Sequence, residues 1–172
     1  GGRLRLVGNL PCYVSSPILF HCVEHARGIA DMLFRLQKEV VERMAAPPGG
    51  KVYGRLSVML QLACEVQPLL RVPAGAFRPP PKVESAVVRL VPRATPLHEG
   101  ADFGRVEAIV RAAFGQRRKT LANALAGLLD PDAIRAAGID PRARAETVPP
   151  QGYVALARAA AEAADLPGTR VL

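Results

Sequence analysis

The sequence has no tryptophan, and only 5% of its 172 residues are aromatic. Its three cysteines, Cys12, Cys22 and Cys64, are widely spaced, and none belongs to a Cys-x-x-Cys pair. This spacing excludes a zinc ribbon, and an odd number of cysteines argues against a disulfide framework. We therefore expect reduced thiols in a cytoplasmic protein that binds no metal.

No uninterrupted apolar segment has the length needed to cross a membrane, and no signal-peptide pattern is present, so we expect no membrane partner. Apolar residues still make up 49% of the chain, which is enough for a packed core and too many for disorder. Gly1 and Gly2 lead directly into a strand-like run, and we expect the sequence to be a piece of a larger protein.

The net charge of +8 is unevenly distributed. Residues 1–96 contain 13 Lys/Arg against 6 Asp/Glu, whereas residues 97–172 contain 10 against 9. A basic surface attracts polyanions and speeds their association, so nucleic acid is the first partner to consider. The alternative is that the charge only keeps the protein in solution.

Hydrophobic periodicity predicts alternating strands and helices, followed by helices alone. In the first part we expect strands at Arg3–Val7, Ile29–Leu36, Val66–Val72 and Glu84–Val91, and helices at Ile18–His25, Gln37–Ala46 and Gly54–Cys64. Beyond a linker at Pro92–Gly100 we expect helices at Phe103–Phe114, Arg118–Leu129, Pro131–Ala137 and Pro150–Ala164. The helix that contains Ile18–His25 has Ser16 as its predicted N-cap and Pro17 at its first position. This order predicts a layered α/β core joined to a small helical bundle.

The segment Gly8–Tyr13 follows a strand, at the place where open α/β sheets bind ligands. It reads Gly-Asn-Leu-Pro-Cys-Tyr. An exocyclic adenine amine is a poor nucleophile because its lone pair is delocalised into the ring. An Asn side-chain oxygen and a backbone carbonyl can accept its two hydrogens and so direct the lone pair toward a methyl donor. The alternative is an ordinary strand-to-helix turn that Pro11 closes.

The motifs resemble those of the ribosomal RNA small-subunit adenine dimethyltransferase A family over nearly the whole chain. The matching segments are Asn9–Pro11 with Ser15–Pro17, Leu36–Val41, Tyr53–Val58, Phe77–Val88, Phe114–Leu121 and Gly138–Glu146. The resemblance implies that residues 1–94 form the C-terminal half of a Rossmann-like class I methyltransferase sheet. Residues 95–172 would then form a helical RNA-binding domain.

The resemblance also implies a reaction, which is transfer of two methyl groups from S-adenosylmethionine to each adenine amine in a small-subunit (16S) ribosomal RNA hairpin. Asn9 would accept from the amine and lie near the cofactor, and the carbonyl of Leu10 or Pro11 would be the second acceptor. Phe77 would stack on the flipped base, held by a proline-rich loop. The expected partner is small-subunit RNA in the 30S subunit, and we expect a monomer.

Two departures from the family are visible in the sequence. Cys12 stands where the family has an aromatic residue, so Tyr13 is the candidate for the second stacking face. The glycine-rich loop and the acidic residues that hold most of the cofactor normally precede this region, and nothing similar occurs in these residues. An RNA-binding module without catalysis is therefore the alternative function, and a degenerate paralogue with a weakened base pocket is a third.

Basic residues at two places are candidates for contacts with RNA phosphates. Arg78 and Lys82 flank the Phe77 loop, where they could equally keep the loop in solution. The other group is Arg117, Arg118 and Lys119, at an expected helix start. Cations there oppose the helix dipole, which favours an external phosphate partner over a purely solvated helix end.

Two further patterns could carry chemistry. His21 and His25 have a spacing that can bind zinc, but Cys22 stands where a metalloprotease motif has Glu, and we interpret them as a core-edge and a surface histidine. Cys12 could be a nucleophile, although no His or Asp lies near it in sequence, and an inert loop thiol is the preferred interpretation.

Overall fold

The computed structural model of the protein describes residues 2–11 and 14–165. The chain divides into two compact units. The first comprises Gly1–Ala46 and Met59–Pro96, and the second comprises Pro47–Val58 and Leu97–Leu172. Across the described residues, no helix combines the length and the apolar character that crossing a membrane requires.

One mixed sheet runs through the first unit. Its strands are β1 (Leu4–Asn9), β2 (Ile29–Gln37), β3 (Cys64–Val72) and β4 (Ser85–Pro92), in the order β1-β2-β4-β3. β1 pairs with β2 in parallel, whereas β4 lies antiparallel to both β2 and β3. The predicted α/β class is confirmed, and the last strand of the sequence order is inserted between β2 and β3.

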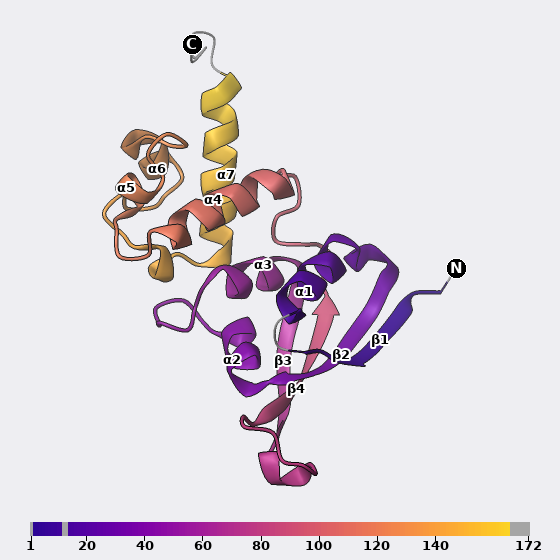
Figure 1. Ribbon diagram of the computed structural model, residues 1–172. Helices are drawn as coiled ribbons and strands as arrows, with labels where there is room; N and C mark the ends of the chain where they lie inside the picture. The colour runs from indigo at the N-terminus through magenta and orange to yellow at the C-terminus, as the bar shows by residue number, and fades with distance from the viewer. Residues whose placement is uncertain (1, 12–13, 166–172) are drawn as a thin grey trace. The chain divides into compact units, whose positions relative to one another are not determined.

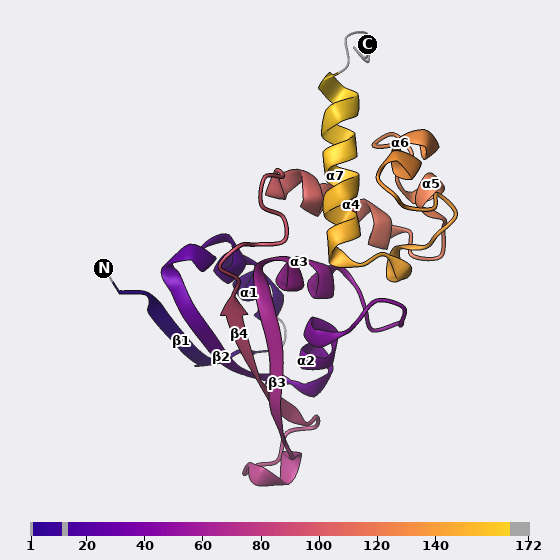
Figure 2. The ribbon, with the colours of Figure 1, turned by 180° about the vertical axis from the view of Figure 1, so that it is seen from behind.

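Two helices, α1 (Ser15–Glu24) and α2 (Lys38–Ala45), lie on the same side of this sheet (Figures 1 and 2). Along β2, Met32, Phe34 and Leu36 are buried, whereas Leu33 and Arg35 between them are partly exposed. This alternation follows from the two-residue period of a strand. The apolar face packs against the helices, and the opposite face carries the polar side chains.

The start of α1 differs from the prediction. The helix begins at Ser15 and its N-cap is Val14, which makes no side-chain capping bond. Val14 already donates its N–H to the Pro11 carbonyl at 3.2 Å, so the chain turns before it reaches the expected cap. Ser16 therefore lies inside the first turn, and Pro17 is tolerated there because the first N–H groups of a helix have no acceptor within it.

The second unit is built from helices in the region predicted to be helical. They are α4 (Phe103–Gly115), α5 (Leu121–Ala124), α6 (Pro131–Ala136) and α7 (Pro150–Asp165), and the helix α3 (Arg55–Ala63) crosses the division between the two units. Asp102 caps α4 by accepting from the Arg105 N–H at 2.9 Å, and Asp130 caps α6. Aspartate at these positions satisfies N–H groups that have no partner in the helix.

Residues 47–58 belong to this second unit, whereas the sequence assigned them to the first part of the chain. The reason is an aromatic cluster in which Tyr53 and Tyr153 are buried and Phe114 is partly exposed. The rings of Tyr53 and Phe114 lie 5.9 Å apart, and those of Phe114 and Tyr153 lie 5.7 Å apart. The Tyr53 hydroxyl donates to the Val148 carbonyl at 2.7 Å, so this segment is tied to the helical unit by both apolar and polar contacts.

The helix expected at Arg118–Leu129 is wrong in extent, because α5 covers only Leu121–Ala124. Thr120 has an extended backbone, with φ −66° and ψ 157°, so no helix can pass through it. The Leu121 and Ala122 N–H groups donate to the carbonyls of Ala143 and Pro141 at 2.8 and 2.9 Å. A distant loop thus satisfies the first turn, and residues 125–128 continue as turns.

Candidate active site

Asn9 is the last residue of β1 and lies at its carboxyl end. The next residue, Leu10, donates its N–H to the Arg35 carbonyl at 3.0 Å, which fixes the backbone directly after Asn9 to β2. The Pro11 carbonyl already accepts the Val14 N–H. Because a carbonyl oxygen has two lone pairs, the Leu10 and Pro11 carbonyls both stay candidates for the second acceptor, and the Leu10 carbonyl is the one directly after Asn9.

Phe77 lies in the loop between β3 and β4. A single 3-10 turn (Ala74–Ala76) precedes it, and the Phe77 N–H donates to the Ala74 carbonyl at 3.2 Å. The prolines that follow restrict the backbone further. The ring is partly exposed, so one of its surfaces is available to a ligand or another side chain.

Arg35 joins Asn9 and Phe77. Its Nε donates to Asn9 Oδ1 at 2.9 Å, and its Cζ lies 4.4 Å from the centroid of the Phe77 ring. Its Nη1 also donates to the Ser85 hydroxyl at 3.2 Å. The two residues that the sequence predicted for one base pocket are thus brought together in the first unit by a single guanidinium.

The sequence interpretation missed Arg35. The signal for it lies in the sheet register, because Asn9 of β1 is the direct partner of Arg35 in β2. Partners in a parallel pair point to the same face, so the only arginine in an otherwise apolar stretch of β2 had to reach the Asn9 side. The register could not be read from the sequence alone, because 26 residues separate the two positions.

Cys12 and Tyr13 lie outside the described residues. That Tyr13 supplies the second stacking face, in place of an aromatic residue at Cys12, therefore stays a prediction. Arg78 and Lys82 are both exposed on the same loop as Phe77. Their predicted contacts with RNA phosphates stay a prediction.

Of the three basic residues at 117–119, one makes hydrogen bonds and an ion pair within the protein. Arg117 Nη2 donates to the Tyr53 carbonyl at 2.5 Å and to the Gly50 carbonyl at 3.4 Å, and it pairs with Glu146 at 3.5 Å. Its guanidinium also lies over the Phe114 ring, at 5.5 Å. Arg118 and Lys119 are exposed. The cluster lies in the turn between α4 and α5, so the expected position at a helix start is wrong.

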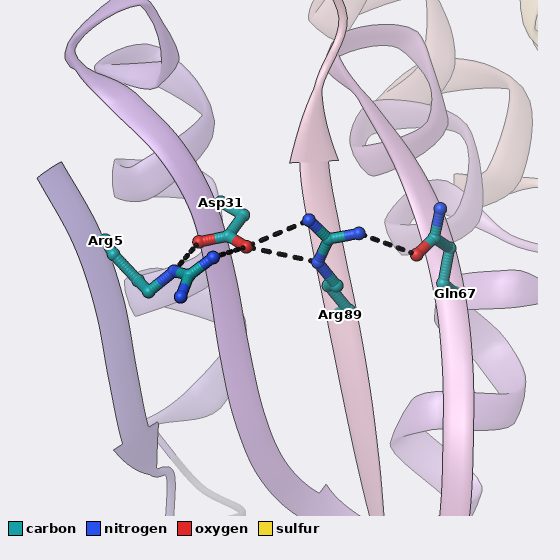
Figure 3. A network of polar contacts seen from close by, with 4 residues as sticks. All are labelled: Arg5, Asp31, Gln67 and Arg89. Atoms are coloured by element: carbon teal, nitrogen blue, oxygen red, sulfur yellow. Dashed lines mark hydrogen bonds and ion pairs between the residues drawn. The ribbon is translucent and has the colours of Figure 1, made fainter. Parts of the chain in front are cut away.

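A polar network spans all the strands of the sheet on the face that carries Arg35 (Figure 3). The Asp31 carboxylate accepts from Arg5 at 2.7 and 3.0 Å and from Arg89 at 3.0 and 3.1 Å, and Arg89 reaches Gln67 at 3.4 Å. Hydrogen bonds from Arg5, and then from Arg89, hold the pKa of Asp31 below its ordinary value. Part of the basic excess of residues 1–96 is therefore paired within the protein.

The other residues considered for chemistry have these surroundings. Cys22 and Cys64 are free and buried, and burial raises the pKa of Cys64 to about 12, so neither resembles a reactive thiolate. His21 and His25 are both exposed, so the expected core-edge position for one of them is wrong. With Glu24 they could offer three ligand atoms within 4.8 Å of one another, and the absence of a metal stays a prediction.

The site and the fold define a class of protein on comparison with known families. The family model described as "Ribosomal RNA adenine dimethylase" matches residues 1–162, and the chain belongs to this family of ribosomal RNA adenine N6,N6-dimethyltransferases. The ribosomal RNA small subunit methyltransferase A of Xanthomonas campestris pv. campestris (strain B100) is 60% identical over 157 residues, which are 91% of this chain. The protein of the same name from Xanthomonas oryzae pv. oryzae (strain PXO99A) is 59% identical over 157 residues. The chain spans 60% of the length of each relative.

Two solved structures share the fold. A dimethyladenosine transferase from Plasmodium falciparum matches with a TM-score of 0.78 at 24% identity, over 88% of this chain and 64% of the other. The 23S rRNA methyltransferase ErmE matches with a TM-score of 0.70 at 27% identity, over 93% of this chain and 66% of the other.

Proposed function

We propose that these residues form the C-terminal part of an enzyme that transfers methyl groups from S-adenosylmethionine to the N6 amines of adenines in small-subunit ribosomal RNA. On this proposal the sheet is the C-terminal half of a Rossmann-like methyltransferase sheet. The observation that carries it is that Asn9 and Phe77 both contact the Arg35 guanidinium, which brings an amine acceptor and an aromatic face near each other at the carboxyl end of β1. We place the enzyme in the cytoplasm, where the small subunit is its partner.

The chain's own contribution is to hold and orient the base. Asn9 Oδ1 and the Leu10 carbonyl accept the two amine hydrogens, which directs the nitrogen lone pair away from the ring plane. Phe77 supports the flipped base by stacking, an interaction worth about 1–3 kcal/mol per base. S-adenosylmethionine, when bound, supplies the methyl group. Asn9 would lie near the cofactor as well as the amine.

The described residues would therefore supply only part of a binding site for the cofactor. Gly49 and Gly50, the only paired glycines of the described chain, lie between α2 and α3, and no strand leads into them. A phosphate- or cofactor-binding glycine turn joins a strand to a helix. We propose that most contacts to the cofactor come from the part of the relatives' length that this chain does not span.

The test measures incorporation of labelled methyl groups from S-adenosylmethionine into small subunits that lack the modification. It uses the 172-residue chain and a chimera in which the N-terminal part of the Xanthomonas campestris relative precedes it. We expect the chimera to be active and Asn9→Ala to lower its rate by about 100-fold, since one aligned hydrogen-bonding group is worth that much in preorganised sites. Asn123→Ala, an exposed asparagine of α5, is the matched control and should leave the rate unchanged.

The alternative function is RNA binding without catalysis, since the only paired glycines of the described chain do not join a strand to a helix. Binding to small subunits by the chain alone, with methyl transfer only by the chimera, would support this role for the 172 residues. A chimera that binds subunits and stays inactive, or one that Asn9→Ala leaves fully active, would contradict the catalytic assignment.

A further inference from the structure

The Arg35 guanidinium makes the two contacts that the proposed function assigns to the substrate base. It donates to the amide oxygen of Asn9 at 2.9 Å, as an adenine amine would. Its carbon lies 4.4 Å from the centre of the Phe77 ring, where a stacked base would lie. A guanidinium is flat, carries N–H donors at its edge and stacks on aromatic faces, so it shares the recognition features of an adenine with its amine.

We propose that Arg35 occupies the adenine position of the site when no substrate is bound and has to move out before an adenine enters. The inference rests on the proposed function, because that function defines the adenine position. Arg35 would then set the threshold for base entry and act as a residue that determines specificity: only a base that stacks and donates as well as the guanidinium can displace it.

A third contact explains why the side chain stays in this place. Ser85, which is buried at the start of β4, accepts from Arg35 Nη1 at 3.2 Å. The backbone of Arg35 is also fixed, because its carbonyl accepts the Leu10 N–H and β4 pairs with it through Val87. The guanidinium is therefore held by hydrogen bonds at two of its nitrogens and by the ring contact on one face. The long side chain still allows it to move toward solvent.

The competing explanation is that Arg35 is a permanent brace. An amide oxygen has two lone pairs, so Asn9 could accept from Arg35 and from an amine at once. A ring has two faces, and Phe77 could carry the guanidinium on one and the base on the other. The two explanations differ in the effect of removing the guanidinium: a displaceable group opposes adenine binding, whereas a brace supports it.

The experiment measures the dissociation constants of the 172-residue chain for two small-subunit RNA hairpins. One carries its loop adenines, and the other has abasic sites at the same positions. The ratio of the two constants isolates the contribution of the bases, because loss of a positive charge weakens phosphate binding equally in both. Binding to the abasic hairpin also shows that each variant is folded.

We expect Arg35→Met to raise the preference for the adenine hairpin about tenfold, which corresponds to about 1.4 kcal/mol. Arg35→Lys keeps the charge but lacks the flat guanidinium and should raise it as well. Arg71→Met, on β3, is the matched control: it removes an exposed arginine of the same unit and should leave the ratio unchanged.

An unchanged or lower ratio in Arg35→Met, with the wild-type chain still preferring the adenine hairpin, would overturn the inference in favour of a brace. If neither the wild-type chain nor Arg35→Met distinguishes the two hairpins, both bind without reading the base. That result would overturn the proposed base pocket itself, and the inference with it.

Discussion

Replacing Arg117 with methionine is expected to destabilise the helical unit rather than to act mainly on RNA binding. The guanidinium donates to the Tyr53 and Gly50 carbonyls and pairs with Glu146, so it ties residues 47–58 to the rest of the unit. Methionine retains an unbranched apolar side chain over the Phe114 ring but has no donor. The loss is therefore confined to the polar contacts.

The magnitude follows from these contacts. A hydrogen bond from a charged group contributes about 1.5–3 kcal/mol, and a partly exposed ion pair adds about 0.2–1 kcal/mol. The Arg117 side chain is 36% exposed, so water replaces part of the interaction. We expect a loss of about 2 kcal/mol, which would lower the Tm by about 4–8 °C in a chain of this size.

The assay combines thermal unfolding with RNA binding over a range of salt concentrations. Arg118→Met is the matched control, because it removes the same charge from the adjacent exposed position. It should leave the Tm unchanged and reduce the salt dependence of binding by about one unit of slope. The reasoning is refuted if Arg117→Met has the same Tm as Arg118→Met and loses RNA affinity to the same extent.

Two further predictions concern stability. A Cβ on Gly152 would lie 2.6 Å from Cγ1 of the buried Val148, so Gly152→Ala should cost about 1–3 kcal/mol in urea unfolding, whereas Gly115→Ala, with open space around its Cβ, should cost nothing; equal stability of the two variants would contradict this packing. Because the pKa of Asp31 is lowered in the folded protein, its stabilisation is present above its unfolded pKa and is lost as the pH falls through that value toward the folded pKa. The free energy of unfolding of the wild type, measured in urea, should therefore fall between about pH 5 and pH 3 more steeply than that of Asp31→Asn. In this variant Arg89 has lost its anionic partner at every pH. Parallel curves for the two proteins would exclude this role.

Local structure was predicted well where it depends on neighbouring residues. The helix expected at Pro150–Ala164 is α7, Pro150–Asp165, because an alanine-rich run with a proline at its start needs little tertiary support. The strand expected at Glu84–Val91 is β4, Ser85–Pro92. The errors at Ser16 and at Arg118 both lie where backbone hydrogen bonds outside the helix decide where it begins. These bonds are the Val14 N–H to the Pro11 carbonyl and the Leu121 N–H to the Ala143 carbonyl.

The sequence by itself determined the α/β class and the family, and it predicted Asn9 and Phe77 as site residues, because each depends on residue types in a fixed local order. Only the tertiary structure decided that β4 lies between β2 and β3, that residues 47–58 join the helical unit, and that Arg35 lies between Asn9 and Phe77. These features depend on the pairing register and on packing between segments far apart in the chain. Such contacts are selected by the summed burial and hydrogen bonding of the whole fold, to which no single stretch of sequence gives access.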